Sequence, residues 1–534
     1  MNLEDVIKKT EKYDVITFDV FDTLLIRDVM KPVDVFRFSY GEIGRYIRIL
    51  AEMSARKSSE TGEVTLSDIN KKCPFSCKRE VQFEKMICRA NPLMKSLYDE
   101  LKKQGKRMYA ISDMYLSSKV ISGLLRKAGY DIPVIVSCEQ GCNKTTGKLF
   151  QQFLNKYSLK PSRVLHIGDN KASDYEGAKK AGIKCILYNK HQNKLFYTDY
   201  TRSNYELAAF VNHGLNEEKK SAEQIGYEIV GPIILSFCQW IHKKYKQDGF
   251  ERLFFLARDM HFTYEVYKRI YKKDKVQYLY VSRKALRYAR TSPHDFISYL
   301  KEEGCYGNVA FVDTGWVGTA QVEVEKYAKK IKQDTDLGGL YLGSRLAYRF
   351  RQRSERSHVF AYASIMEQLR CELMSPFLEV LIGSQERQVV SYDKGIPVFN
   401  SNTEYEKDNP IKVGAKHFIR DWIRYKNNKT ILSRNIKKPF EKLFLSPKSE
   451  DVELLGSLQC DDRIISQIIT YEGKDKYRNN LSLWLKDLSL SPWKGGFFYK
   501  SFKHYKSFLR AYLICNTARN IIIDVIYIKR DQLE

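Results

Sequence analysis

Short apolar segments alternate with segments of helical pattern along the first 190 residues of this chain. The apolar segments are rich in β-branched residues and end in polar residues or glycine, as buried strands do. They are residues 15–18, 107–111, 134–137 and 164–167. The helical segments between them include residues 92–104, 118–128 and 148–157. This order predicts a doubly wound, parallel α/β sheet.

One long segment interrupts this alternation, between the first strand and Arg107. Its pattern is mostly helical, over residues 33–56 and 78–90. Ligands of open α/β sheets bind beyond the carboxyl ends of the strands. We therefore expect a helical cap, about residues 28–105, over that edge of the sheet.

The chain has 534 residues, more than one hydrophobic core usually serves. A polar stretch, residues 190–220, follows a first domain of residues 1–195. A second alternating pattern then places strand-like segments at residues 253–256, 278–281, 309–312 and 340–342. We expect a second Rossmann-like α/β domain at 220–345 and a mixed, mostly helical C-terminal region at 346–534.

Composition narrows the class of protein and of partner. A net charge of +26 favours an anionic partner: a phosphorylated substrate, nucleic acid or an acidic membrane surface. Among the eleven scattered cysteines, Cys73 and Cys77 lack the further ligands of a zinc site, which favours a reduced, cytoplasmic protein. No apolar segment suits a signal peptide or a bilayer span. We expect a cytoplasmic protein, with peripheral contact at the inner membrane face as a further option.

Two polar motifs follow predicted strands in the first domain. Asp19 begins the sequence Asp-Val-Phe-Asp-Thr directly after the first strand. A carboxylate there can attack a phosphate, if a cation screens the repulsion, and form an aspartyl-phosphate. Ser112 ends the next strand, where its hydroxyl can donate to a phosphate oxygen or cap a helix.

A lysine and two further acids complete the set. An ammonium group can neutralise the charge shared by nucleophile and phosphoryl group, and Lys148 is the better placed candidate, with Lys144 as its rival. The strand at residues 164–167 ends in glycine and is followed by Asp169 and, five residues later, Asp174. Carboxylates in this arrangement suit a hard ion such as Mg²⁺.

Together and in this order, the four motifs resemble those of the haloacid-dehalogenase superfamily: DxDx[T/V], Ser or Thr, Lys, and GDxxxxD or a close variant. The resemblance covers residues 15–188. It implies that Asp19 is the nucleophile and that Mg²⁺ is the cofactor. The implied metal ligands are Asp19, the Phe21 carbonyl, Asp169 and Asp174, with Asp174 alternatively orienting a metal-bound water or the lysine. The implied phosphate contacts are Ser112 and Lys148.

The chain departs from the superfamily's phosphatases two residues after the nucleophile. An acid there protonates the leaving group, which contributes about 10²–10⁴-fold to the rate. This chain has Phe21 instead, and the acid stands one position later, at Asp22. One step turns a side chain to another direction, so Asp22 is a candidate rather than an automatic substitute. A slow or specialised phosphatase is favoured over a phosphotransferase or phosphonate enzyme, and over a domain that binds without turnover.

Longer phrases point to a narrower group. The sequences FDVFDTLL (18–25), ISDMYL (111–116) and FLARD (255–259) are similar to long bacterial hydrolase-like proteins that accompany capsule or other surface-polysaccharide synthesis. This resemblance implies a sugar or polyol phosphate, or a glycan precursor, as the substrate. The alternative is a catalytically reduced binding or scaffold protein of a membrane-side glycan assembly complex.

Two loops of the second domain are candidate substrate contacts and raise the option of a second activity. Each follows a predicted strand, and glycines in the second loop would let backbone amides approach an anion. An aspartate there could instead hold a sugar hydroxyl, and two ordinary turns are the plain alternative. The candidate residues are Arg258, Asp259, Asp313, Thr314, Gly315 and Gly318.

The C-terminal stretch 491–523 contains aromatic residues, lysines and arginines but no Asp or Glu. Such a segment can lie on an anionic membrane or stack on single-stranded nucleic acid. It can also be a packed helix with a solvated face. Between the two ligands the membrane is favoured, and nucleic acid is not expected as a partner.

Overall fold

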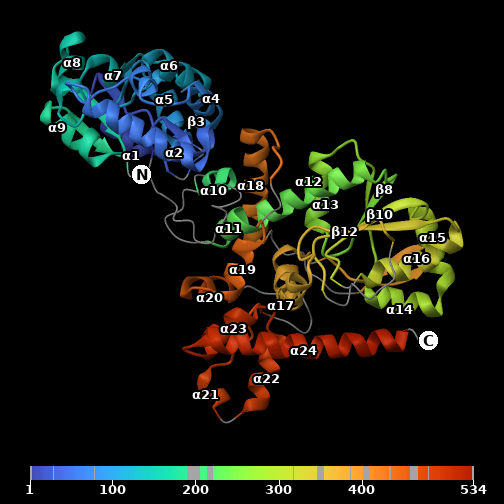
Figure 1. The fold of residues 1–534 in the computed structure, drawn as a ribbon. Helices are drawn as coiled ribbons and strands as arrows, with labels where there is room; N and C mark the ends of the chain where they lie inside the picture. The colour runs from blue at the N-terminus through green and yellow to red at the C-terminus, as the bar shows by residue number, and fades with distance from the viewer. Residues whose placement is uncertain are drawn as a thin grey trace. The chain divides into compact units, whose positions relative to one another are not determined.

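The computed structural model of this protein contains two compact units, and each is described by itself (Figure 1). The first holds the described residues up to Tyr188 together with residues 205–212, and the second holds the described residues from Ser221 onward. The structure describes residues 3–27, 29, 31–76, 78–188, 205–212, 221–316, 318–345, 354–384, 386–400, 409–431, 435–456, 467–478 and 480–531. The predicted polar connector lies largely outside these residues, as do Cys77 and the domain limits predicted at 195, 220 and 346.

The first unit is built on a five-stranded parallel sheet with the order β5-β4-β1-β6-β7. Its strands are β1 (Val15–Phe18), β4 (Arg107–Ser112), β5 (Val134–Val136), β6 (Val164–Gly168) and β7 (Lys184–Leu187). Every side chain of the central strand β1 is buried, which explains its unbroken apolar and β-branched sequence. The predicted α/β fold with a parallel sheet is confirmed.

Helices connect these strands, as parallel pairing requires. After α1 (Leu3–Thr10), which precedes β1, they are α5 (Pro92–Lys103), α6 (Ser118–Lys127), α7 (Ser137–Gln140), α8 (Lys148–Lys156), the 3₁₀ turn η1 (Pro161–Arg163), the π-helical turn η2 (Lys171–Glu176) and α9 (Gly177–Lys180). The last described helix of this unit is α10 (Tyr205–Asn212).

The segment inserted between β1 and β4 is mostly helical. It contains α2 (Asp34–Lys57), α3 (Leu66–Lys71) and α4 (Lys78–Ile87). The expectation of a helix over all of residues 78–90 is wrong at its end, because residues after Ile87 form strand β3 (Cys88–Ala90). This strand pairs antiparallel with β2 (Leu25–Arg27), so hydrogen bonding to a distant segment overrides the local helical pattern.

The second unit contains another five-stranded parallel sheet, with the order β12-β11-β10-β8-β9. Its strands are β8 (Arg252–Leu256), β9 (Val276–Leu279), β10 (Asn308–Asp313), β11 (Asp336–Tyr341) and β12 (Ser357–Val359). All four predicted strands are present, although β9 lies two residues earlier than expected. Because β12 pairs with β11, the sheet extends past residue 345, the end predicted for this domain.

The remaining described elements of this unit are mostly helical. Those up to residue 382 are α11 (Ala222–Ile225), η4 (Gly226–Val230), α12 (Gly231–Gln247), α13 (His261–Ile270), α14 (Arg283–Thr291), α15 (Pro293–Glu303), α16 (Thr319–Ile331) and α17 (Ile365–Ile382). They are followed by the hairpin β13 (Val389–Asp393) and β14 (Ile396–Phe399) and by α18 (Pro410–Lys426), α19 (Lys438–Leu445), α20 (Ser449–Gly456), α21 (Lys474–Tyr477), α22 (Leu481–Leu490), α23 (Lys494–Ser501) and α24 (Tyr505–Asp531).

The aromatic C-terminal stretch contributes to the core of the second unit. Trp493, Phe497 and Phe498 are buried, and the Trp493 ring stacks on Phe377 with 5.0 Å between ring centroids. These rings are therefore not free to enter a membrane or to stack on bases, whereas Phe508 remains half exposed. Among the helices in the described ranges, none has the length and apolar character needed to cross a bilayer.

Candidate active site

Two acidic residues meet where β1 and β6 end side by side. Asp19 follows β1, and its backbone N–H donates to the carbonyl of Ile167 in β6 at 2.9 Å. Asp169 directly follows β6, so the carboxyl ends of two paired strands deliver both carboxylates to one edge of the sheet. The Thr23 hydroxyl donates to Asp169 Oδ1 at 3.3 Å and ties the loop after β1 to the loop after β6.

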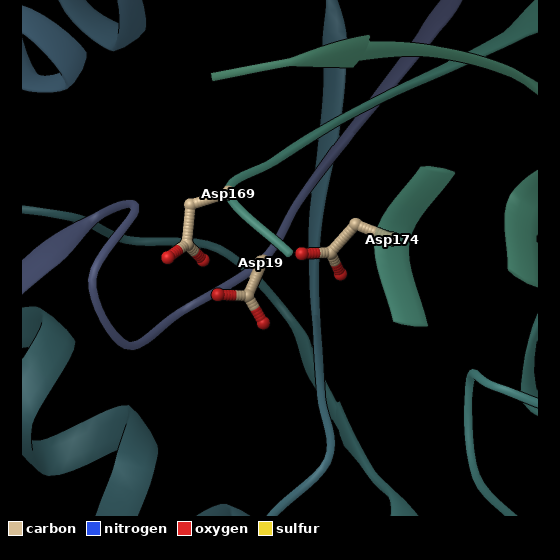
Figure 2. Close-up of side chains that lie close together, drawn as sticks. All are labelled: Asp19, Asp169 and Asp174. Carbon is tan, nitrogen blue, oxygen red and sulfur yellow. The ribbon is translucent and has the colours of Figure 1, made fainter. Parts of the chain in front are cut away.

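Asp174 joins this pair from the π-helical turn η2. One oxygen each of Asp19, Asp169 and Asp174 lies within 4.8 Å of the others, and Figure 2 shows the three carboxylates gathered around one region. A Cβ at position 168 would stand 2.3 Å from Asp174 Cγ, so only glycine at the end of β6 permits this approach. The group is the one such cluster that the described residues contain.

The lysine of the site is Lys144, and the expectation of Lys148 needs correction. Lys144 Nζ lies 2.5 Å from Asp19 Oδ1 and 2.5 Å from Asp174 Oδ1, and the side chain is almost fully buried. Lys148 is the first residue of α8 and is exposed. The three residues between them form the turn that begins α8, and this turn directs only the earlier lysine toward the strand ends.

Two contacts hold the Lys144 loop against the site. The Asp113 carboxylate, directly after Ser112, accepts the backbone N–H of Lys144 at 2.9 and 3.1 Å. Gly177 packs on the same loop so closely that a Cβ there would lie 2.1 Å from the Lys144 carbonyl oxygen. The loop is therefore fixed from two sides before any substrate binds.

Asp174 is the best-supported carboxylate of the three. Its Oδ1 contacts Lys144 Nζ and lies 3.2 Å from His166 Nε2, and its Oδ2 accepts the backbone N–H of Asn170 at 2.9 Å. His166 Nδ1 in turn lies 2.8 Å from the Thr17 hydroxyl. Although burial alone would raise the pKa of Asp174, Lys144 and His166 lower it below its usual range.

Asp19 is in the opposite electrostatic situation. Burial raises its pKa to about 8; Lys144 lowers it, and the neighbouring charges of Asp174 and Asp169 add to the increase. Lys144 contacts two of the three carboxylates, so negative charge exceeds positive charge among these four side chains. A divalent cation would remove this excess, and three carboxylates are ligands that such an ion prefers.

The loop after β1 does not place a second acid in an obvious catalytic position. Phe21 is buried, and the guanidinium of Arg27 lies 4.7 Å from the centre of its ring. Asp22 accepts a hydrogen bond from Arg27 Nη2 at 3.3 Å, and Arg27 also pairs with the buried Glu84 at 3.7 Å. Asp22 thus links the loop to strand β2, and this ion pair argues against the predicted catalytic role for Asp22.

The site also contains Ser112 and three residues that sequence reasoning missed. Ser112 is buried at the carboxyl end of β4, which neighbours β1. Sequence reasoning assigned no role to Asp113, His166 or Gly177. Asp113 directly follows Ser112, and His166 lies in the predicted strand 164–167 before Asp169, so their nearness to predicted site residues was a usable signal, whereas nothing local marked Gly177.

The candidate substrate contacts of the second domain lie in the second unit, at the carboxyl ends of β8 and β10. Arg258 and Asp259 follow β8, and Asp313 ends β10. Thr314 is buried next to Asp313, and its hydroxyl lies 3.4 Å from Asp259 Oδ2. Val317, in the same loop, is outside the described residues. The structure therefore brings the two predicted loops together.

Comparisons with known proteins concern the first part of the chain. Residues 13–182 match the model of the haloacid dehalogenase-like hydrolase family. A 2-haloacid dehalogenase from Pseudomonas syringae pv. Tomato DC3000 is similar over 33% of this chain and 86% of its own, with 16% identity and a TM-score of 0.26. A HAD phosphatase from Thermococcus onnurineus is similar over 34% and 88%, with 16% identity and a TM-score of 0.27. No curated protein matches the sequence.

Proposed function

We propose, from the premise that residues 13–182 form a haloacid dehalogenase-like hydrolase domain, that this domain is a magnesium-dependent phosphatase or phosphoryl-transfer enzyme. Asp19 is its nucleophile and forms an aspartyl-phosphate. The observation that carries the proposal is the contact of one buried lysine with two members of a three-carboxylate cluster at a strand edge. A purely structural ion pair would not need a third carboxylate within the same 4.8 Å.

The donor set fits magnesium, with unequal parts for the three acids. Both oxygens of Asp174 already accept hydrogen bonds, from Lys144, His166 and Asn170, so this residue orients the lysine and the loop. Asp19, Asp169 and the Phe21 carbonyl are the ligands we propose. When bound there, the ion would supply positive charge to the oxygens of a substrate phosphate.

The chain's own residues perform a two-step displacement. An Asp19 carboxylate oxygen attacks phosphorus, and the bond from phosphorus to the leaving oxygen breaks. Water then attacks the phosphorus of the aspartyl-phosphate, which releases phosphate and restores the Asp19 carboxylate. Lys144 balances the charge that passes between Asp19 and the phosphoryl group, and Ser112 donates to a phosphate oxygen.

The leaving oxygen must take up a proton, and the loop after β1 supplies no dedicated acid for it. Phe21 occupies the usual position and Asp22 is paired with Arg27. We therefore propose a slow or specialised enzyme, with turnover lower by about 10²–10⁴-fold than an acid at that position would allow for the same ester. Esters with acidic leaving groups should suffer least.

The proposed substrates are sugar or polyol phosphates of surface-polysaccharide biosynthesis. This part of the proposal depends on the similarity of sequences 18–25, 111–116 and 255–259 to long bacterial proteins associated with that process. Contact with an anionic membrane would bring such a protein near lipid-linked precursors. The excess of lysine and arginine over acids supports the contact, but the buried tail rings do not contribute to it.

Release of phosphate by the full chain tests the proposal. Sugar and polyol phosphates and p-nitrophenyl phosphate are incubated with the protein in Mg²⁺ or in EDTA. We expect release in Mg²⁺ only, and complete loss in Asp19→Asn. Asp14→Asn, a matched change at the exposed start of the same strand, should retain full activity. Equal activity of Asp19→Asn and the unchanged protein would reject the nucleophile.

A catalytically reduced binding protein is the second candidate function. The observation that favours it is the use of Asp22 in an ion pair with Arg27, which leaves proton transfer without a donor in this loop. Such a domain would bind phosphate esters in Mg²⁺ and release no phosphate from any of them. Absence of release from p-nitrophenyl phosphate, whose leaving group needs no acid, would favour this function over the enzyme.

A further inference from the structure

The second sheet reverses its strand order beside β8. From β8 the chain adds β9 on one side and then returns to place β10, β11 and β12 on the other. Ligands of open α/β sheets bind at the carboxyl ends of the two strands that flank such a reversal. The residues at this point are Arg258 and Asp259, after β8, and Asp313, at the end of β10.

Two carboxylates share one hydroxyl donor at this point. Thr314 Oγ1 lies 3.4 Å from Asp259 Oδ2 and 3.5 Å from Asp313 Oδ1. A hydroxyl carries one proton and can donate to only one of them at a time. Burial raises the pKa of Asp313 to about 7, and the charge of Asp259 adds to that increase. Each side chain nevertheless keeps some contact with solvent.

A third carboxylate, Glu379 of α17, faces the same group. Its Oε1 accepts a hydrogen bond from the indole N–H of Trp316, in the loop after β10. Burial raises the pKa of Glu379 to about 7, and the charge of Asp259 raises it further. Asp259 therefore interacts electrostatically with both of the other acids.

Two arginines next to these acids make no direct contact with them. Arg258 and Arg283, the first residue of α14, both stabilise the Asp259 carboxylate electrostatically. Within the described parts of the chain, neither guanidinium forms an ion pair or a hydrogen bond. Arg345 differs, because Ser375 accepts from its Nε at 3.0 Å and Glu372 lies 3.9 Å away. Arg258 and Arg283 are thus near enough to stabilise the Asp259 charge but form no ion pair with it in the described part of the chain.

We propose that this edge binds a phosphorylated sugar, with its phosphate on Arg258 and Arg283 and its hydroxyls on Asp259 and Asp313. Guanidinium groups pair with phosphate in a planar, two-pronged geometry. Carboxylates accept hydrogen bonds from sugar hydroxyls. Among the described residues, these acids do not form a group with the spacing of metal ligands. This second site is independent of the hydrolase domain and adds a binding function to the chain.

Binding of α-D-glucose 1-phosphate to the full chain tests the site. The protein carries Asp19→Asn so that the probe is not consumed, and hydrogen–deuterium exchange locates the protected peptides. We expect protection of the loops after β8 and β10, and an affinity at least about 10-fold lower in Arg283→Ala, because a charge-assisted hydrogen bond is lost. Lys284→Ala, the same loss of charge at the adjacent exposed residue, should bind as the parent does.

Three results would overturn the proposal. One is that the sugar phosphate protects the two loops equally well in Arg283→Ala and in Asp313→Asn as in the parent. The second variant is included because Arg283→Ala could disturb α14 locally. Another is absence of protection at these loops by hexose phosphates. The third is equal affinity for inorganic phosphate alone, which would show an anion site without sugar recognition. None of these results bears on phosphate release at Asp19, so the two proposals fail separately.

Discussion

The two parallel sheets of this protein place acids at equivalent points. In the first sheet the strand order reverses between β1 and β6, and Asp19 and Asp169 follow these strands. In the second it reverses between β8 and β10, where Asp259 and Asp313 stand. Both sheets therefore carry acids at the edge where open α/β sheets bind ligands.

The two points differ in how their charges are compensated. Lys144 contacts Asp19 and Asp174 directly in the first unit, at 2.5 Å each. In the second unit, Arg258 and Arg283 act on Asp259 only through space. Strand topology thus determines where the acids of each sheet lie. Direct contact with a cation determines whether their side chains are already held in place. We therefore propose catalysis at the first point and ligand binding at the second.

Removing the buried lysine should have the largest effect. In Lys144→Gln the carboxylates of Asp19 and Asp174 lose their shared cation, and breaking a buried pair in this way costs about 3–5 kcal/mol. The free energy of opening of the first unit should fall by that amount. Hydrogen exchange of peptides from β1 and β6 in EDTA measures it. Phosphate release should fall at least about 10²-fold.

Lys148→Gln is the matched control for this variant. Lys148 is exposed at the start of α8, so its replacement should change the opening free energy by no more than about 0.5 kcal/mol. Equal effects of the two variants would show that the contacts of Lys144 do not compensate the carboxylates, and the contrast between the two units would disappear.

Strand patterns made the two sheets predictable, because buried parallel strands leave a continuous apolar signature. The strands after Asp14, Lys106 and Arg163 begin where the sequence places them. The early part of β11 escaped detection because Gly338 and Gly339 carry no side-chain signal, and Gly338 is required by the Phe250 ring, which a Cβ would approach to 2.4 Å. Packing partners distant in sequence impose such requirements, and local pattern does not record them.

The site was predictable in its acids but not in its lysine. The three acids were predictable because their spacing from the ends of predicted strands matches the motifs: Asp19, Asp169 and Asp174. The two candidate lysines, Lys144 and Lys148, stand close together in one loop, so spacing does not distinguish them. Their separation depends on the path of that loop, which Asp113 and Gly177 fix from elsewhere in the chain. The C-terminal rings show the same limit, because an aromatic, basic sequence is compatible with a membrane surface and with the core that the structure shows around Trp493.

A smaller effect should appear in the pH dependence of the second unit. Folding raises the pKa of Asp313 to about 7, so the folded state holds its proton more tightly than the unfolded state. The resulting stability is complete below the unfolded pKa and is lost as pH rises through about 7. Between pH 5.5 and 8 this loss is about 1–2 kcal/mol, at about 1.4 kcal/mol for each pKa unit.

Asp313→Asn should remove the part of the pH-dependent stability that comes from Asp313. The part that comes from Glu379, whose pKa is also raised, should remain. All five tryptophans of the chain lie in the second unit, so their fluorescence during guanidinium denaturation reports this unit selectively. Asp393→Asn, a change at an exposed acid of β13, should keep the full slope. An unaltered slope in Asp313→Asn would show that burial and the charge of Asp259 do not raise the pKa of Asp313 in the folded chain.

The smallest expected effect concerns the unpaired arginine. Arg283 is exposed and forms no ion pair in the part of the chain that the structure describes, so Arg283→Gln should change the unfolding free energy of the second unit by no more than about 0.5 kcal/mol. The same tryptophan signal measures it, with Arg345→Gln as the contrast, since that change releases Ser375 and Glu372 and should cost more. A loss of several kcal/mol in Arg283→Gln would mean that the arginine already neutralises Asp259 in the folded chain. The second unit would then need no ligand to compensate the charge of Asp259.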